Sequence, residues 1–387
     1  HSFTGEDVIE ISCHGSVFIQ QRILQLLIQN GARMARPGEF TQRAYLNGKM
    51  DLSQAEAVAD LIASQSAAAH SIALRQMKGG ISNEIKSLRN ELLTFISLIE
   101  LELDFSEEDV EFANRDSLFQ LINKIHHLIS NLVDSFRYGN AIKNGIPVAI
   151  IGAANVGKST LLNFLLREER AIVSEIAGTT RDTIEDVVTI DGVQFRFIDT
   201  AGIRATSDTI ESMGIERTFA KIEQANIVLI LLDATDLNNS KFFLENHIVD
   251  KINLKDCAVI INKIDIANQS DCDELYEIST KLGIPALPVS AKKQINLDAL
   301  VTFLLNSIHK GTISENDVVI TNARHYEALS KADEAVSRVI DGLKNNISGD
   351  FLAQDIRECL HYLGSITGDI STDEVLGNIF KNFCIGK

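Results

Sequence analysis

A glycine-rich motif that can hold phosphate lies in the middle of the chain. Residues 152–159 read Gly-Ala-Ala-Asn-Val-Gly-Lys-Ser and match the pattern G-x-x-x-x-G-K-[ST] between an apolar strand pattern and an apolar helix pattern. Glycines let backbone N–H groups curl around phosphate oxygens at the N-terminus of a helix. We expect Lys158 to neutralise the β- and γ-phosphates and the Ser159 hydroxyl to bind Mg²⁺. The motif predicts a nucleotide site but does not distinguish adenine from guanine.

Three later motifs, in a fixed order, identify the base as guanine. Residues 199–202 (Asp-Thr-Ala-Gly) end a strand pattern, so that Asp199 can hold the Mg²⁺ shell and Gly202 can donate its N–H to the γ-phosphate. Residues 262–265 (Asn-Lys-Ile-Asp) end another, and the Asp265 carboxylate can accept from the ring N–H and the amino group of guanine, a donor pair that adenine lacks. Residues 290–292 (Ser-Ala-Lys) follow the next strand. Alone they are better explained as a polar loop, but the ordered set predicts GTP binding.

The segment between the first two motifs is expected to respond to the γ-phosphate. Thr180 lies in residues 178–182 (Gly-Thr-Thr-Arg-Asp) and is placed to reach Mg²⁺ when the γ-phosphate is present, as in a switch; a polar hairpin loop is the alternative. The nucleotide-binding residues that these motifs predict are Asn155, Val156, Gly157, Lys158, Ser159, Thr160, Gly178, Thr179, Thr180, Asp199, Thr200, Ala201, Gly202, Asn262, Lys263, Asp265, Ser290, Ala291 and Lys292.

Hydrolysis needs a group that orients water, and the usual position does not supply one. Small regulatory GTPases commonly have Gln directly after the D-x-x-G motif, but here that residue is Ile203. Spacing alone does not choose among the carboxylates that follow, which are Asp208, Glu211 and Glu216. Asn155 presents an oxygen inside the phosphate loop and could hold a monovalent cation that offsets transition-state charge. The alternative is that Asn155 only orders the loop.

The apolar patterns that must position these motifs change their period along the chain. Buried-strand patterns at 148–152, 195–198, 227–232 and 258–261 alternate with helical stretches and predict an α/β domain with a mostly parallel sheet. The flanking stretches, 49–145 and 311–387, have helical spacing, which predicts a bundle. We therefore expect a Ras-like P-loop G domain, residues 146–310, inserted into one helical domain.

The first 48 residues predict a partial α+β domain. Residues 7–12 alternate with period two, as in a strand, and residues 17–28 have helical periodicity. The chain begins without Met or a signal-peptide pattern, so we expect it to start partway into this domain.

Composition excludes several classes of protein. Among 387 residues, 36 are Lys or Arg and 53 are Asp or Glu, and the formal net charge of −17 argues against a protein that coats nucleic acid. Five dispersed cysteines lack zinc spacing and suit reduced thiols. The apolar runs are too short to span a bilayer, so we expect a cytoplasmic protein with no membrane partner.

In these motifs and in further stretches, the chain resembles the MnmE (also called TrmE) family of tRNA-modification GTPases over essentially its whole length. The stretches that carry the resemblance are residues 2–7, 35–40, 51–57, 176–182 and the terminal Phe-Cys-Ile-Gly-Lys at 383–387. The resemblance implies that the first domain binds folate and forms a homodimer. Ala154 departs from the residues that many relatives carry in the phosphate loop, which should affect rigidity more than chemistry.

The resemblance also implies how GTP is hydrolysed. It adds Ser174, Glu175, Ile176 and Ala177 to the nucleotide-binding loop. It implies K⁺ in place of an arginine finger, with the K⁺ ligands Asn155, Ser174, Ile176 and Thr179, and it leaves Mg²⁺ to Ser159 and Thr180. The family's catalytic glutamate falls on Glu211, and GTP with K⁺ brings two G domains together.

The last implication is the modification chemistry. The resemblance implies a tetrahydrofolate one-carbon carrier (the 5-formyl or methylene form) at Glu10, Lys49 and Lys387, with Cys384 taking part in the reaction. With the FAD-dependent partner MnmG, the protein would convert C5 of the wobble uridine (U34) of certain tRNAs to a (carboxymethyl)aminomethyl form. Two other functions are alternatives to tRNA modification. One is a GTP switch in ribosome assembly, which would need a basic RNA module that is not visible in the sequence. The other is a structural, dynamin-like GTPase.

Overall fold

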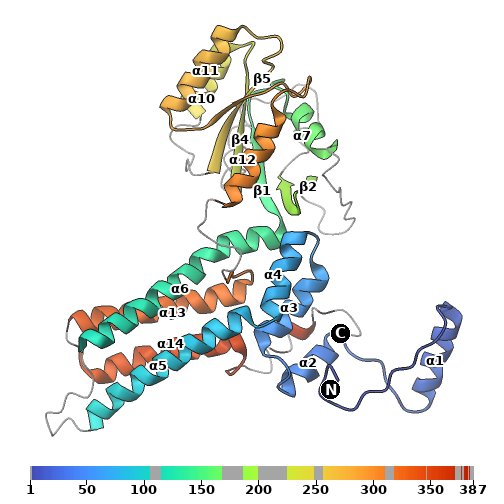
Figure 1. Cartoon of the computed structure of the whole chain (residues 1–387), viewed down its shortest axis with the longest axis vertical. Coiled ribbons are helices and arrows are strands. Elements are labelled where there is room, and N and C mark those ends of the chain that lie inside the picture. Colours follow the sequence, from blue (N-terminus) through green and yellow to red (C-terminus); the bar gives the residue numbers. More distant parts are fainter. Residues whose placement is uncertain are drawn as a thin grey trace. The chain divides into compact units, whose positions relative to one another are not determined.

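The computed structural model describes residues 2–104, 115–167, 186–198, 225–247, 256–309, 318–345, 347–370, 376, 379–381 and 383. The chain divides into two compact units (Figure 1). The first, the helical unit, comprises residues 1–64, 70–136 and 318–387, and the second, the sheet unit, comprises residues 65–69 and 137–317. In sequence, almost all of the sheet unit therefore lies between two stretches of the helical unit.

The sheet unit is built on a six-stranded sheet in the order β2-β3-β1-β4-β5-β6. Only the β2–β3 pair is antiparallel among these strands. The strands are β1 (Ile146–Ile151), β2 (Asp186–Ile190), β3 (Val193–Phe197), β4 (Ile227–Asp233), β5 (Cys257–Asn262) and β6 (Ala286–Pro288). The helices of this unit are α7 (Lys158–Arg167), α10 (Leu237–His247), α11 (Gln269–Lys281) and α12 (Leu297–His309).

The continuous apolar runs of β4 and β5 fit their places as interior strands of the sheet. Every residue of β5 is buried, as is every residue of β4 except its last, Asp233. A parallel strand covered on both faces reads as such a run rather than as an alternation. The predicted strands at 148–152, 195–198, 227–232 and 258–261 are confirmed within one or two residues. The parallel pairing brings the carboxyl ends of β1, β4 and β5 to one edge.

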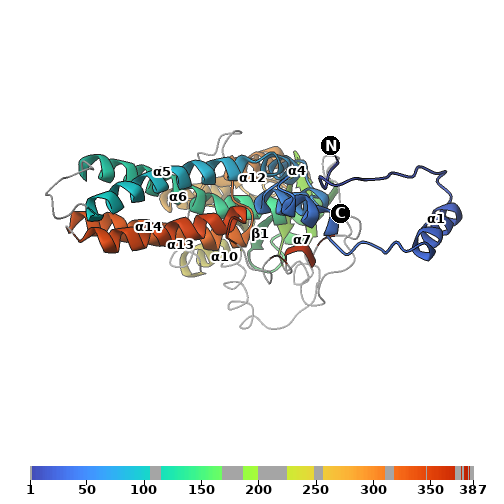
Figure 2. The same ribbon diagram turned by 90° about the horizontal axis from the view of Figure 1, so that it is seen from below.

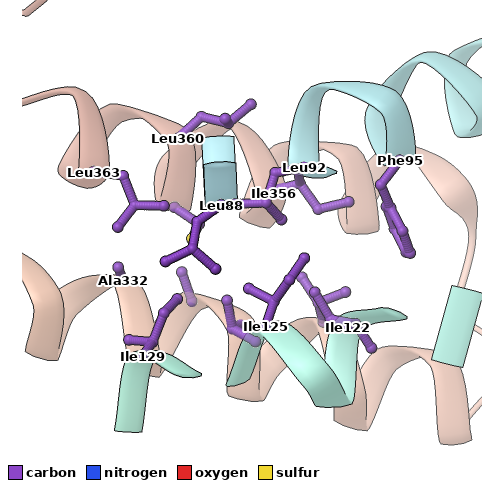
Figure 3. Close-up of a cluster of buried hydrophobic side chains, with 14 of the residues drawn as sticks. Leu88, Leu92, Phe95, Ile122, Ile125, Ile129, Ala332, Ile356, Leu360 and Leu363 are labelled. Carbon is purple, nitrogen blue, oxygen red and sulfur yellow. The ribbon is translucent and has the colours of Figure 1, made fainter. Parts of the chain in front are cut away.

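Four long helices form the body of the helical unit and run alongside one another in Figures 1 and 2. They are α5 (Gly80–Asp104), α6 (Arg115–Asn144, of which residues 115–136 belong to this unit), α13 (Ala323–Lys344) and α14 (Gly349–Thr367). Their apolar faces meet in one core, in which Leu92 and Phe95 of α5 face Ile125 of α6 and Ile356 of α14 (Figure 3). The bundle that helical spacing predicted is confirmed, and it combines helices that precede the sheet unit in sequence with helices that follow it.

The shorter helices of this unit precede the bundle. They are α1 (Val17–Gln29), α2 (Glu39–Leu46), α3 (Leu52–Ala63) and α4 (Ala67–Met77). Helix α3 begins with a capping box, because the Asp51 side chain accepts from the N–H of Gln54 and the Gln54 side chain accepts from the N–H of Asp51.

The strand predicted at residues 7–12 is wrong, although the helix predicted at 17–28 is confirmed. Residues 7–12 have no regular secondary structure and are exposed, with Ile9 90% and Ile11 56% accessible. A strand needs a neighbouring backbone to satisfy its N–H and C=O groups, and none of the described residues pairs with this segment. Among the described residues, no helix is both long and apolar enough to cross a membrane.

Candidate nucleotide site

The phosphate-loop motif forms a turn between β1 and α7, and the turn requires glycine at two positions. Gly152 and Gly157 have φ of +156° and +105°, and a Cβ at either position would lie 2.3 Å from another atom: the Leu231 carbonyl oxygen for Gly152 and Asn262 Nδ2 for Gly157. A side chain at these positions would force the loop away from β4 and β5. The glycines therefore let the loop lie directly against the two neighbouring strand ends.

The polar residues of this loop lie at and just before the N-terminus of α7, the end of a helix that favours an anion. Lys158 and Ser159 begin α7, whose first turn holds no acidic residue, so the positive end of the helix dipole favours an anion. Lys158 Nζ donates to the carbonyl oxygens of Gly152 at 2.8 Å and of Ala153 at 2.7 Å, which holds the ammonium over the loop. Asn155 is exposed with φ of +61°, a left-handed backbone that suits Asn.

Asn262 joins the phosphate loop to the predicted base site. It ends β5 and is only 3% exposed. Its Nδ2 donates to the carbonyl oxygen of Val156 at 2.8 Å, and its Oδ1 accepts from the N–H of Ala291 at 3.0 Å. One amide side chain thus uses both of its ends to connect residues 152–159 with residues 290–292. The structure brings these three predicted motifs together.

Asp265, the residue expected to bind guanine, is hydrogen-bonded to Ser290. The Ser290 hydroxyl donates to Asp265 Oδ1 at 2.6 Å, and it also accepts from the N–H of Lys293 at 3.1 Å. Ser290 is buried, whereas Asp265 is exposed. The bond fixes the carboxylate while leaving Oδ2 to accept from a ligand, since a carboxylate offers about four lone-pair directions.

Lys263, the remaining charged member of its motif, is held by a residue that the sequence interpretation did not single out. Its Nζ lies 2.5 Å from Oδ2 of Asp233, the last residue of β4. Burial alone would raise the pKa of Asp233, but hydrogen bonds from Lys263 and Thr235 outweigh it and hold the pKa below its ordinary value. Asp233 is therefore ionised at neutral pH. The signal that could have identified it is a carboxylate at the carboxyl end of a buried parallel strand.

Many predicted residues lie outside the described part of the chain. They are Ser174, Glu175, Ile176, Ala177, Gly178, Thr179, Thr180, Asp199, Thr200, Ala201, Gly202, Glu211, Cys384 and Lys387. Lys292 and Thr160 are described and exposed. The two other folate candidates, Glu10 and Lys49, are also exposed, Glu10 on the irregular segment before α1 and Lys49 just after α2.

The described residues that precede Cys384 are anchored on α2 and α3. Phe380 and Phe383 are buried, and they pack in one cluster with Leu52 of α3. The rings of Tyr45 and Phe380 are 6.3 Å apart between centroids. The backbone of Gly38, with φ of +67°, lies close to Phe380, because a Cβ there would lie 2.7 Å from the Phe380 carbonyl oxygen. Phe380, Phe383 and residues 38–52 therefore form one packed region.

Comparisons with known proteins give a consistent result. The family model described as "MnmE helical domain" matches residues 52–384, and that described as "GTP-binding protein TrmE N-terminus" matches residues 1–49. The chain is 57% identical over 390 residues to the tRNA modification GTPase MnmE of Bacteroides thetaiotaomicron, covering 100% of this chain and 84% of the relative. It is 55% identical to that of Flavobacterium johnsoniae with the same coverage.

Solved structures that resemble the chain cover less of it. A variant of Era from Aquifex aeolicus bound to GDP and aluminium fluoride is 32% identical and covers 49% of this chain and 66% of its own, with a TM-score of 0.32. The G domain of the iron transporter FeoB from T. maritima is 25% identical and covers 42% of this chain and 98% of its own, with a TM-score of 0.31.

Proposed function

Since the chain belongs to the MnmE (TrmE) family, and is therefore a GTP-hydrolysing enzyme of tRNA modification, we propose that it modifies C5 of the wobble uridine (U34). The product would be a (carboxymethyl)aminomethyl uridine made with a tetrahydrofolate one-carbon unit and the FAD-dependent partner MnmG. The strongest support for a GTP site comes from Asn262. Asn262 bonds both the phosphate loop and the residue 290–292 loop, so the base end and the phosphate end of a guanine nucleotide site are assembled together.

In the proposed site, each end of GTP meets groups suited to it. The N–H groups of residues 155–160 and the Lys158 ammonium would bind the phosphates. Asp265, held by Ser290, would accept from the two N–H donors of guanine, and the backbone of residues 290–292 would lie near its carbonyl oxygen. Mg²⁺ would neutralise charge on the β- and γ-phosphates, with Ser159, at the start of α7, offering the hard oxygen ligand that this ion prefers. Thr180, Asp199 and Gly202 are proposed to complete the γ-phosphate end.

We propose that Glu211 positions the attacking water and that K⁺ supplies the positive charge on the transition state. Asn155, Ser174, Ile176 and Thr179 are the proposed K⁺ ligands. The exposure of Asn155 supports this role, because an exposed Asn within the phosphate loop can offer its side-chain oxygen to a cation. If so, replacing K⁺ with Na⁺ should lower kcat at least tenfold, and Glu211→Ala should lower it about a hundredfold, in the range expected for loss of a side chain that acts on the attacking water. Equal rates in both salts would exclude K⁺.

The one-carbon chemistry is proposed for the other end of the chain. Glu10, Lys49 and Lys387 would bind the tetrahydrofolate derivative, and Cys384 would take part in the reaction. The packing of Phe380 and Phe383 against α2 and α3 supports this assignment, because it anchors the residue directly before Cys384 among the residues of the N-terminal segment. We further propose a homodimer built on residues 1–48 and a GTP-dependent association of the G domains.

The proposed domain boundaries follow the sequence patterns. They are residues 1–48 for the partial folate domain, 146–310 for the G domain, and 49–145 with 311–387 for the helical domain.

Mass spectrometry of tRNA nucleosides tests the proposal directly. Bacteria that lack the gene should accumulate tRNA without the C5 modification of the wobble uridine, and plasmid-borne wild-type protein should restore it. Cys384→Ser should fail to restore it while retaining GTP hydrolysis, which separates the two activities. Normal wobble uridine in the deletion strain, beside defective ribosomal particles, would instead support the role in ribosome assembly.

A further inference from the structure

Asp233 is a charged residue in contact with residues 262–265 that the proposed function does not use. It ends β4, whose residues pair in parallel with β5, so that Asp233 stands directly opposite Asn262. The register continues for one more residue, since the Ala234 N–H donates to the Asn262 carbonyl oxygen at 3.0 Å. Strand pairing therefore brings Asp233 beside residues 262–265 independently of any side-chain interaction.

The carboxylate of Asp233 is held from two directions. Its Oδ1 accepts from the N–H of Thr235 at 2.9 Å and from the Thr235 hydroxyl at 2.6 Å. Its Oδ2 contacts Lys263 Nζ at 2.5 Å. The backbone is fixed as well, because the Ser240 hydroxyl donates to the Asp233 carbonyl oxygen at 2.9 Å. Asp233 is a rigid anchor, and Lys263 is the group that it anchors.

Lys263 needs such an anchor for two reasons. A lysine side chain has many rotamers, and ordering it when a ligand binds costs affinity unless it is already ordered. Its backbone has φ of +67°, a left-handed conformation that a non-glycine residue keeps only when its surroundings impose it. The ion pair is only partly accessible, with the side chains of Asp233 and Lys263 15% and 30% exposed, so solvent screens it less than a surface pair.

We propose that Asp233 is a positioning residue for the guanine nucleotide, acting through Lys263. Asp233 fixes the ammonium and the left-handed backbone of Lys263 before ligand arrives. The four-carbon stem of Lys263 is therefore already ordered, between Asn262 and Asp265, when the nucleotide binds. This inference rests on the proposed assignment of residues 262–265 to guanine. Loss of the anchor should weaken nucleotide binding by about three- to tenfold, the cost of ordering one long side chain on binding.

A double-mutant cycle on the full chain tests the proposal, with the fluorescent analogue N-methylanthraniloyl-GDP as the probe. Asp233→Asn should weaken binding three- to tenfold and raise KM for GTP, while kcat changes less than twofold. In the double variant, Asp233→Asn should weaken binding no further than Lys263→Ala alone, because Asp233 acts only through Lys263. Asp236→Asn is the matched control, since Asp236 bonds Asn239 of α10, and it should bind like wild type. Wild-type affinity in Asp233→Asn, or additive losses in the double variant, would overturn the inference.

Two further variants cover a failure of Asp233→Asn to fold and a wrong assignment of Asp265 to guanine. If Asp233→Asn fails to fold, Lys263→Met removes the ammonium while keeping the stem; it should show the same three- to tenfold loss, and wild-type affinity would overturn the inference. Asp265→Asn separates this inference from the assignment beneath it. If Asp265→Asn loses GDP binding and Asp233→Asn does not, only the role of Asp233 is wrong. If Asp265→Asn still binds GDP like wild type, the guanine assignment is wrong and the inference falls with it.

Discussion

Replacing Glu56 with glutamine should destabilise the helical unit by about 3 kcal/mol at neutral pH. Glu56 lies on α3, and its side chain is 9% exposed. Its Oε1 accepts from Arg324 Nε at 2.9 Å, and its Oε2 accepts from Arg324 Nη2 at 2.7 Å. His325 Nε2 lies 2.7 Å from the same Oε2. Arg324 in turn donates to the carbonyl oxygens of Ser365 and Ile366 at the end of α14. Glu56 thus connects α3 to α13, and Arg324 extends the network to α14.

The magnitude follows from the pKa of Glu56. Burial alone would raise this pKa, but His325 and Arg324 outweigh it and lower the value from 4.5 to about 2. A tenfold change in an equilibrium is 1.36 kcal/mol, so the ionised form is worth about 3 kcal/mol to the folded state. Because the folded pKa is the lower one, this stability is complete above the unfolded pKa of 4.5 and is lost as the pH falls toward 2. The variant cannot titrate here, so its disadvantage should shrink between about pH 5 and pH 2.

Pulsed hydrogen exchange across a urea series measures this, since peptides from α13 and α14 report the helical unit separately from the sheet unit. At pH 7, Glu56→Gln should shift the exchange midpoint of these peptides to lower urea, and the shift should shrink markedly by pH 3. Glu327→Gln, an exposed substitution on α13 itself, is the matched control and should leave the midpoint unchanged. Equal midpoints at pH 7, or a shift that persists undiminished at low pH, would refute the assigned charge network.

Two other predictions concern the nucleotide site and the end of the chain. Asn262→Ala should weaken GDP binding at least tenfold in equilibrium dialysis, because it leaves the Val156 carbonyl and the Ala291 N–H without their partner; unchanged affinity would mean that these loops are held otherwise. Gly38→Ala should abolish wobble-uridine modification and change the rate at which iodoacetamide alkylates Cys384, while GTP hydrolysis stays normal, because its Cβ would clash with the Phe380 carbonyl. Normal modification in that variant would show that the close packing at Gly38 does not matter for the reaction.

The local motifs of the sheet unit could be predicted because each depends on its own neighbours in sequence. A buried apolar run followed by a glycine turn determines where a strand ends, and polar residues placed there meet at one sheet edge. Asn262, Asp265 and Ser290 were therefore identifiable before their distances were known. The parallel sheet followed from the same alternation of strands and helices.

Interactions between distant segments could not be predicted in this way. The contact of Asp233 with Lys263 depends on β4 lying beside β5, and the contact of Glu56 with Arg324 joins residues far apart in the chain. The strand expected at residues 7–12 was wrong for a related reason, because alternation shows which face is apolar but does not provide a neighbouring strand.

The measurement that tests the central claim most directly is nucleotide preference in the Asp265→Asn variant. A carboxylate accepts from the two N–H donors of guanine, whereas an amide can donate to the oxygen that xanthine carries in place of the guanine amino group. Steady-state hydrolysis of GTP and XTP by both proteins should therefore show wild type preferring GTP and the variant preferring XTP, with total turnover retained. A variant that still prefers GTP, or a wild type that hydrolyses both equally, would contradict the assignment of Asp265 to guanine and with it the nucleotide site described above.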